Sequence, residues 1–168
     1  MESILVSACL LGQTVRYDGG SVLCDHPVLQ QWSREGRIVA VCPEVAGGLP
    51  VPRPRSEIVA GHDGMMVLAG SAKVVNAQGR DVSTYFVRGA RQALELAQEK
   101  RVRIAVLKQG SPSCGTGTIF DGTFSGTKVA GSGVAAALLR QSGVCVFSED
   151  QVMEADALLK ELEAGRAG

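Results

Sequence analysis

The sequence predicts a single-domain α/β fold in which a mostly parallel sheet carries helices on both faces, a Rossmann-like three-layer arrangement. Short, continuous apolar runs alternate along the chain with segments of helical periodicity, a pattern typical of parallel strands that are buried on both faces. The 168 residues suit one domain, expected to span residues 1–168, and they are enough to bury a core.

Four short apolar runs are the expected strands of the sheet. They cover residues 4–8, 37–41, 102–107 and 144–147. Right-handed crossovers place the carboxyl ends of parallel strands on the same edge of a sheet, where ligands commonly bind. The loops that follow the first three strands are therefore expected to build the functional site.

Four segments with helical spacing separate or follow the expected strands. They cover residues 25–35, 81–100, 132–141 and 149–164. Asp25 is the expected N-cap of the first helix, and Gly36 is expected to end it. Proline and glycine in residues 43–55 predict an irregular loop, and residues 65–76 fit either a hairpin or an irregular excursion.

The charge balance argues against large polyanionic partners. Lys plus Arg and Asp plus Glu both number 17, so the formal net charge is zero, whereas proteins that bind nucleic acids usually carry a basic patch. Aromatic residues make up 4% of the chain, too few to suggest a stacking platform for single-stranded nucleic acid. We therefore expect no nucleic-acid partner. The expected assembly is a monomer or a small homo-oligomer.

The hydropathy pattern predicts a cytoplasmic protein. No apolar run approaches the ~18 residues that a membrane span needs, and the first residues lack the cationic region of a signal peptide. We therefore expect no association with a membrane. In the cytoplasm, five cysteines predict metal binding or catalysis in preference to a disulfide framework.

Three cysteines follow three different expected strands. Cys9 comes after the first strand, Cys42 after the second, and Cys114 lies in the loop after the third. Packing alone would explain one such cysteine, but three at equivalent positions indicate a shared site. Cys145 lies within the fourth strand and is expected to pack in the core. Cys24 precedes the first helix, where a thiol pKa can be lowered, and is expected to have no functional role.

Three thiolates fit two kinds of metal site. A catalytic zinc ion takes three protein ligands and a water, whereas an iron–sulfur cluster held by three cysteines leaves one iron open. The chain lacks a Cys-x-x-Cys pair, and neither His26 nor His62 lies beside Cys9, Cys42 or Cys114 in the sequence. Widely spaced cysteines, one per loop, therefore favour the cluster. The alternatives are a zinc-dependent hydrolase that uses the same three cysteines and a non-enzymatic iron–sulfur or thiol redox sensor.

Polar residues beside these cysteines are candidates for catalysis. Glu44 lies two residues after Cys42. It could act as a general acid or base, or pair with Arg53 or Arg55. The hydroxyls of Ser111 and Ser113 could bond to the local backbone. The hydroxyl of Ser111, three residues before Cys114, could instead contact a substrate or relay a proton.

Further residues are expected to line the pocket. Lys108 ends the third strand and could offset the negative charge of a thiolate-bound cluster, and Ser113 lies in the loop that follows. Arg16 and Tyr17 belong to a polar turn after the first cysteine and could line the mouth of the pocket. Residues 131–133 (Gly-Ser-Gly) open an expected helix, as in a phosphate-binding turn, but they lack the full pattern of a nucleotide-binding module.

Three motifs together resemble the thiouracil desulfurase (desulfidase) family. They are Ser7-Ala8-Cys9-Leu10-Leu11-Gly12, Cys42-Pro43-Glu44 and Ser111-Pro112-Ser113-Cys114-Gly115. The resemblance covers about residues 3–160 and implies a 4Fe–4S cluster that is held by Cys9, Cys42 and Cys114, with the fourth iron open. It also implies that a thiolated uracil, of the 2-thiouracil or 4-thiouracil type, binds this iron through sulfur and is converted to the oxo base with release of sulfide, without net redox change. Glu44 and Ser111 match the positions taken to be catalytic in the family.

Overall fold

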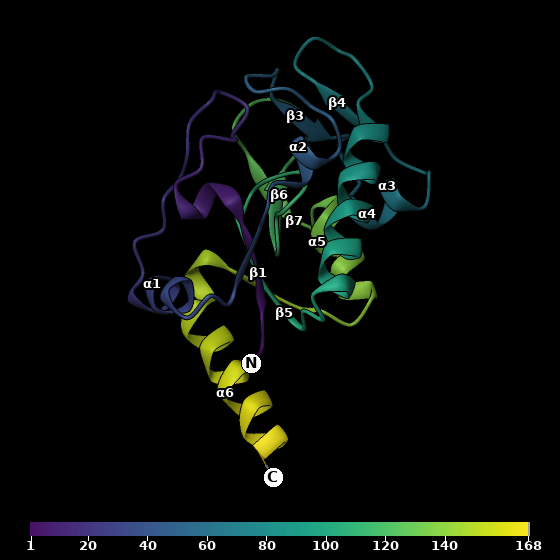
Figure 1. Ribbon diagram of the computed structural model, residues 1–168. Coiled ribbons are helices and arrows are strands. Elements are labelled where there is room, and N and C mark those ends of the chain that lie inside the picture. Colours follow the sequence, from purple (N-terminus) through teal and green to yellow (C-terminus); the bar gives the residue numbers. More distant parts are fainter. Residues whose placement is uncertain (168) are drawn as a thin grey trace.

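The centre of the molecule is a four-stranded parallel sheet (Figure 1). This computed structural model describes residues 1–167. In spatial order the strands are β2 (Ile38–Val41), β1 (Ile4–Ser7), β5 (Ile104–Leu107) and β8 (Cys145–Ser148). Ile4 pairs in register with Ile38 on one side and with Ile104 on the other. The predicted parallel sheet is confirmed.

Helices cover both faces of this sheet (Figure 1). They are α1 (Pro27–Arg34), α4 (Ser83–Glu99), α5 (Val134–Gln141) and α6 (Val152–Ala167). Because side chains alternate along a strand, Leu5 belongs to the core beneath α4 and α5, whereas Ile4 and Val6 belong to the core beneath α1 and α6. The predicted three-layer arrangement is therefore confirmed.

Shorter elements lie beyond the carboxyl ends of the central strands (Figure 1). They are α2 (Pro43–Ala46), β3 (Ser56–Ile58), α3 (Gly64–Leu68), β4 (Val74–Asn76), β6 (Thr118–Phe120) and β7 (Lys128–Ala130). β3 pairs with β4 and β6 with β7, both antiparallel. A third cluster of buried side chains, which includes Ile58, Phe86 and Ile119, joins these elements to α4 and α5.

Several expected local structures differ from those observed. His26, and not Asp25, caps α1, since its ring Nδ1 accepts a hydrogen bond of 3.1 Å from a first-turn amide. The expected loop over 43–55 begins with α2, because a proline suits the first position of a helix. Residues 65–76 contain most of α3 and all of β4. Both structures expected for residues 65–76, a hairpin and an irregular excursion, are therefore wrong.

The ends of the chain and the β6–β7 hairpin add further differences. The first strand ends at Ser7, because the next residues form the short 3-10 helix η1 (Ala8–Leu11). A second 3-10 turn, η2 (Glu149–Gln151), precedes α6 and carries a capping box at Ser148. The β6–β7 hairpin was not predicted, because its three-residue strands lie among Gly, Ser and Thr. None of the described helices combines the length and hydropathy of a bilayer span.

Cys145 is exposed, so its predicted packing in the core is wrong. It begins β8, which is an edge strand of the central sheet. The burial of β8 increases along the strand until Ser148, which is buried. An apolar run in the sequence therefore did not distinguish an edge strand from a central strand.

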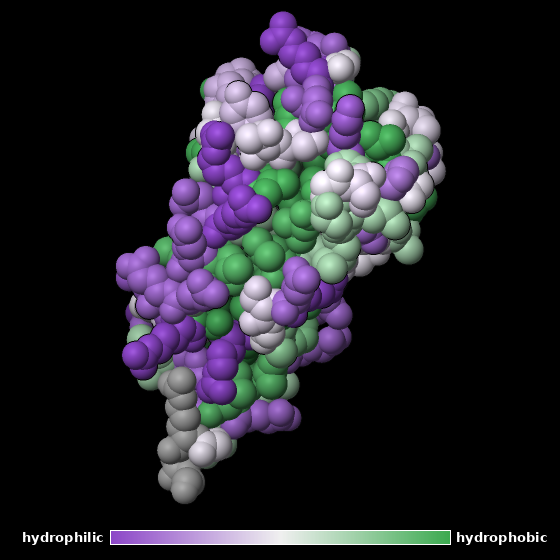
Figure 2. All heavy atoms as spheres, turned by 90° about the vertical axis from the view of Figure 1, so that its right-hand side faces the viewer, coloured by the Kyte–Doolittle hydropathy of each residue, from purple (hydrophilic) through white to green (hydrophobic). Residues whose placement is uncertain are grey.

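One face of the surface carries a band of hydrophobic residues between hydrophilic borders (Figure 2). Large apolar side chains on α3 and α4 that remain exposed include Met65, Met66 and Tyr85. None of these three side chains lines the pocket described below. The exposed apolar surface of α3 and α4 is thus separate from the candidate site.

Candidate functional site

A pocket of about 230 Å³ lies at the carboxyl ends of the parallel strands. Its lining includes Cys9, Cys42 and Cys114, and the three motifs thus meet in one place although they are far apart in the chain. Cys9 lies in η1 directly after β1, and Cys42 is the N-cap of α2, directly after β2. Cys114 lies in the loop after β5. The parallel topology is what brings the three thiols together.

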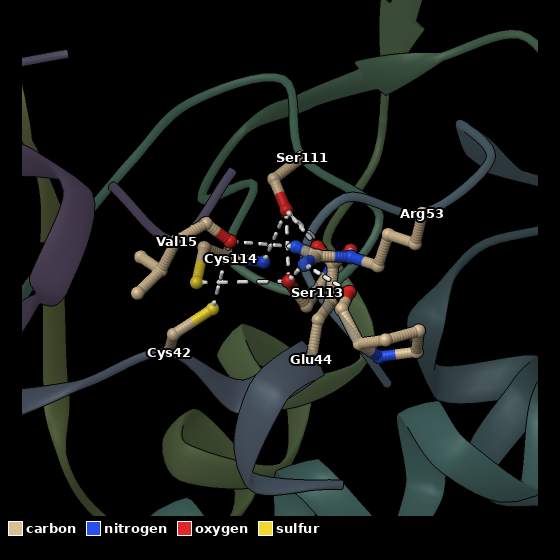
Figure 3. Close-up of polar contacts among 8 residues, drawn as sticks. Val15, Cys42, Glu44, Arg53, Ser111, Ser113 and Cys114 are labelled. Atoms are coloured by element: carbon tan, nitrogen blue, oxygen red, sulfur yellow. Dashed lines mark hydrogen bonds and ion pairs between the residues drawn. The ribbon is translucent and has the colours of Figure 1, made fainter. Parts of the chain in front are cut away.

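The three thiols are shielded from solvent to different extents. Cys114 is buried, and Cys9 and Cys42 are half-buried. Burial raises the pKa of Cys9 to about 11, and the neighbouring Cys42 thiol adds to this increase. Burial likewise raises the pKa values of Cys42 and Cys114. Figure 3 shows the Cys42 and Cys114 sulfurs on the same side of the polar network, with Ser113 Oγ 3.8 Å from Cys114 Sγ.

The raised thiol pKa values predict slow alkylation of the pocket cysteines in protein prepared without iron. The thiolate is the reactive form, so at pH 8 we expect Cys9 to react with iodoacetamide at about a tenth of the rate of the exposed Cys145, or less. Because the pKa of Cys9 is raised to about 11, its rate should keep increasing as the pH is raised toward that value. Peptide mass spectrometry measures both sites. Equal rates at pH 8 would contradict the prediction.

Glu44 is held in a polar network by an arginine and two serines (Figure 3). Its Oε1 accepts a hydrogen bond of 3.1 Å from Arg53 Nε. Its Oε2 accepts one of 2.8 Å from Ser113 Oγ, whereas Ser111 Oγ is 3.4 Å away. The two serine hydroxyls are themselves 2.8 Å apart. Of the two partners suggested by the sequence, Arg53 is therefore the one that pairs with Glu44.

Arg53 is buried and links three segments around the pocket. Besides Glu44, its guanidinium donates to the carbonyl oxygens of Pro50 at 3.1 Å and Val15 at 3.0 Å. The Val15 carbonyl also accepts a long contact of 3.9 Å from Cys42 Sγ. These bonds fix the orientation of the Glu44 carboxylate beside the thiols.

The loop that carries Cys114 is fixed by its own serine and by α5. Ser111 Oγ accepts hydrogen bonds of 3.1 Å from the amides of Ser113 and Cys114. The amides of Val134 and Ala135, in the first turn of α5, donate to carbonyl oxygens of this loop at 2.8 and 2.9 Å. The start of α5 therefore supports the cysteine loop and does not offer these amides to a phosphate, contrary to the suggestion from residues 131–133.

The other predicted pocket residues also lie at this pocket. Arg16, Tyr17, Lys108 and Ser113 all line it. Lys108 Nζ lies 3.8 Å from a carboxylate oxygen of Glu149. The polar turn is tied to the site because the Tyr17 carbonyl accepts a hydrogen bond of 2.8 Å from the Arg53 amide.

Among the lining residues that sequence analysis did not identify as such are Arg55, Gln109, Phe120 and Lys128. Gln109 Oε1 accepts hydrogen bonds from the amides of residues 116, 117 and 118 at 3.0 to 3.2 Å, which shapes the loop. Its position directly after Lys108 was the available signal. Phe120 and Lys128 belong to the hairpin that the sequence pattern did not reveal.

Cys24 lies outside the lining of the pocket. It is half-buried and packs against the core beneath α1 and α6. Burial raises its pKa, so the lowered pKa suggested by its place before a helix is wrong. Helix α1 begins at Pro27, which leaves the Cys24 thiol before the first turn.

The donor set fits a cluster better than a single ion. Within residues 1–167, no three His, Cys, Asp or Glu side chains lie close enough together to hold one metal ion. A zinc ion gathers its ligands around one point, whereas a cubane cluster takes one thiolate at each of several irons. Three buried or half-buried thiols on separate loops of one pocket meet that requirement.

The comparisons with known proteins agree with this site. The family model of 2-thiouracil desulfurase matches residues 4–151, and the chain belongs to this family. The uncharacterized protein YbbK of Bacillus subtilis (strain 168) is 44% identical over 149 residues, which are 89% of this chain and 97% of that relative. A solved structure described as the 4Fe-4S-dependent thiouracil desulfidase TudS is 49% identical, with a TM-score of 0.86 over 95% of this chain and 99% of that one. The resemblance found in the three motifs is confirmed.

Proposed function

We propose that this protein removes the sulfur of a thiolated uracil, of the 2-thiouracil or 4-thiouracil type. Water supplies the oxygen of the resulting carbonyl group and two protons leave with the sulfur as hydrogen sulfide, so no electrons are gained or lost. The observation that carries the proposal is the convergence of three thiols and the Glu44 carboxylate at one pocket. Membership of the family and the similarity to TudS support the same reaction.

Cys9, Cys42 and Cys114 are the residues that would hold a 4Fe–4S cluster with one iron free of protein ligands. When bound, the cluster would supply a soft Lewis acid for the thiocarbonyl sulfur. The pocket cations suit thiolate ligands: although burial raises both pKa values, Arg16 and Lys108 act against this increase at Cys9, as Arg53 does at Cys42. In this proposal Lys108 would offset part of the negative charge of a thiolate-bound cluster.

Glu44 is the proposed general base. Arg53 holds its Oε1, so Oε2 is the oxygen that would take a proton from the attacking water. The same oxygen accepts the hydrogen bond from Ser113, which in turn lies 2.8 Å from the Ser111 hydroxyl. This chain of hydroxyls would lead the proton to Ser111, which would donate it to a ring nitrogen or to the departing sulfur. Ser113 is therefore the link between the two proposed catalytic residues.

Anaerobic reconstitution with iron and sulfide tests the three cysteines. We expect the native protein to bind about four irons per chain and to convert 4-thiouracil to uracil. Cys9→Ala, Cys42→Ala and Cys114→Ala should each lose the cluster absorbance and turnover. Cys24→Ala and Cys145→Ala are matched controls outside the pocket and should retain both. Iron analysis and chromatography of the product measure the two effects.

The same experiment separates the alternatives. If colourless protein that contains zinc turned over the substrate, the zinc-dependent hydrolase would be the correct hypothesis and the iron–sulfur enzyme would be wrong. A cluster that binds with four irons but never turns over a thiouracil would favour the redox sensor. A small pyrimidine substrate and a cytoplasmic reaction in a monomer or small homo-oligomer belong to the proposal, supported by the charge balance and the five free thiols.

A further inference from the structure

The β6–β7 hairpin contributes one wall of the pocket. Phe120 and Lys128 come from its two strands and line the pocket together with Arg55, which precedes β3. The cysteines and Glu44 come from other segments, namely those that follow β1, β2 and β5. The hairpin therefore brings an aromatic ring and a cation to the pocket, but no thiol and no carboxylate.

A single buried carboxylate ties the turn of this hairpin to the body of the protein. The Glu57 side chain, on β3, is 1% exposed. Its Oε1 accepts hydrogen bonds from the amides of Gly122 at 2.9 Å and Phe124 at 3.2 Å, both in the turn between β6 and β7. Its Oε2 accepts one of 2.5 Å from Arg55 Nη2. Loss of this carboxylate would leave two turn amides and a guanidinium without their acceptor.

Arg55, which is held by Glu57, contacts the aromatic ring in the pocket and so links the position of that ring to Glu57. Its guanidinium carbon lies 5.2 Å from the centre of the Phe120 ring and 5.8 Å from that of Phe124. Lys128 Nζ lies 5.5 Å from the centre of the Phe120 ring. Such cation–π contacts fix the orientation of a ring when the cations themselves are held.

The turn needs an anchor because its backbone is constrained. Gly122 has a φ of +91°, and a Cβ added there would lie 2.5 Å from the Ala60 nitrogen. Phe124 has a φ of +57°, a left-handed backbone conformation that costs free energy for residues other than glycine. The close packing of Gly122 on the segment after β3 and the two bonds to Glu57 hold this conformation.

We propose that Glu57 is a positioning residue, which holds the β6–β7 hairpin as the substrate-facing wall of the pocket, and that Phe120 contacts the pyrimidine ring. The proposal rests on the proposed function for the identity of the substrate. Phe120 suits this role because a flat aromatic side chain offers its face or edge to another ring. Because none of the proposed cluster ligands lies on the hairpin, disturbing it should weaken substrate binding and leave the iron content unchanged.

Glu57→Ala in the reconstituted protein tests the anchor. We expect KM for 4-thiouracil to increase about tenfold with kcat within about threefold, the pattern for lost binding that is common to the ground and transition states. The iron content should be unchanged. In protein prepared without iron, the amides of Gly122 and Phe124 should exchange with deuterium at least about tenfold faster, while the β1 and β5 amides keep their protection. Glu57→Gln retains one amide oxygen as acceptor and should show a smaller change of the same kind.

Two further variants make the test specific. Asp121→Ala removes a carboxylate from the same turn. This carboxylate bonds to Thr123 and not to Glu57 or Arg55 in the described part of the chain, so KM and the exchange of Gly122 should not change. Phe120→Leu should raise KM without faster exchange in the turn. The positioning role of Glu57 would be overturned if Glu57→Ala changed neither KM nor the amide exchange of the turn. It would also be overturned if Asp121→Ala changed these two quantities by the same amount. Absence of thiouracil turnover in the native protein would instead overturn the proposed function and the Phe120 contact, while amide exchange would still decide the anchor.

Discussion

Glu44→Gln is expected to lower the desulfuration rate by about 100-fold or more, the contribution typical of a positioned acid or base. The glutamine has the same shape and can still accept the hydrogen bond from Ser113, but it cannot take a proton from water. Its pairing with Arg53 also loses the charge of the carboxylate. Because Glu44 is not a proposed ligand, the iron content should remain that of the native protein. Single-turnover kinetics and iron analysis on the same sample measure both quantities.

A matched control is available on the surface of α4. Glu95 is exposed, so Glu95→Gln removes one carboxylate from the protein without touching the pocket and should leave the rate unchanged. If Glu44→Gln retained both its cluster and the native rate, Glu44 would not be the base. If it lost the cluster, its contribution would be to the assembly of the site.

Gly89→Ala is expected to destabilise the protein by about 1–3 kcal/mol or more, as overpacking of a tight contact does. Gly89 lies on α4 where that helix contacts α2, and a Cβ there would lie 1.9 Å from the Pro43 oxygen. From the other side, a Cβ at Gly47 would lie 2.0 Å from the Tyr85 oxygen. The backbones of α2 and α4 are thus in direct contact, and neither can move aside locally.

The consequence should extend to the pocket, because Cys42 is the N-cap of α2 and Glu44 lies within that helix. A displaced α2 should reduce cluster uptake along with stability. Denaturant unfolding and iron analysis measure the two effects. Gly165→Ala is the matched control, since Gly165 lies in α6 with nothing within 4 Å of an added Cβ. It should stabilise the protein slightly, by up to about 1 kcal/mol. Equal stability of the two variants would contradict the close α2–α4 contact.

Much of the fold could be predicted from the sequence because strands and long helices leave local periodic patterns. The strands that became β1, β2, β5 and β8 and the helices α1, α4, α5 and α6 were all expected, with ends shifted by a few residues. The elements that were missed, among them α2, α3, β3 and the β6–β7 hairpin, have at most five residues in each helix or strand. Such short elements are stabilised by neighbours distant in the chain, such as Gly89 for α2 and Glu57 for the hairpin turn.

The composition of the candidate site could also be predicted, since residues that follow successive parallel strands must meet at one edge of the sheet. The three cysteines, Glu44 and both serines were identified in this way and by motif. Their contacts were not. Only the structure shows that Arg53 holds Glu44 while Arg55 pairs with Glu57, and that Ser113 is nearer to Glu44 than Ser111 is.

The sequence by itself thus determined the parallel sheet and the family, because both depend on local patterns and motifs. It also indicated a three-cysteine site, since strand direction decides which loops share an edge. Tertiary structure decided that Cys145 is exposed and that the hairpin lines the pocket. It also decided that the Ser113 hydroxyl lies nearer to Glu44 than the Ser111 hydroxyl does. These features depend on contacts between side chains that are tens of residues apart in the sequence. Only the packing of the whole chain determines such contacts.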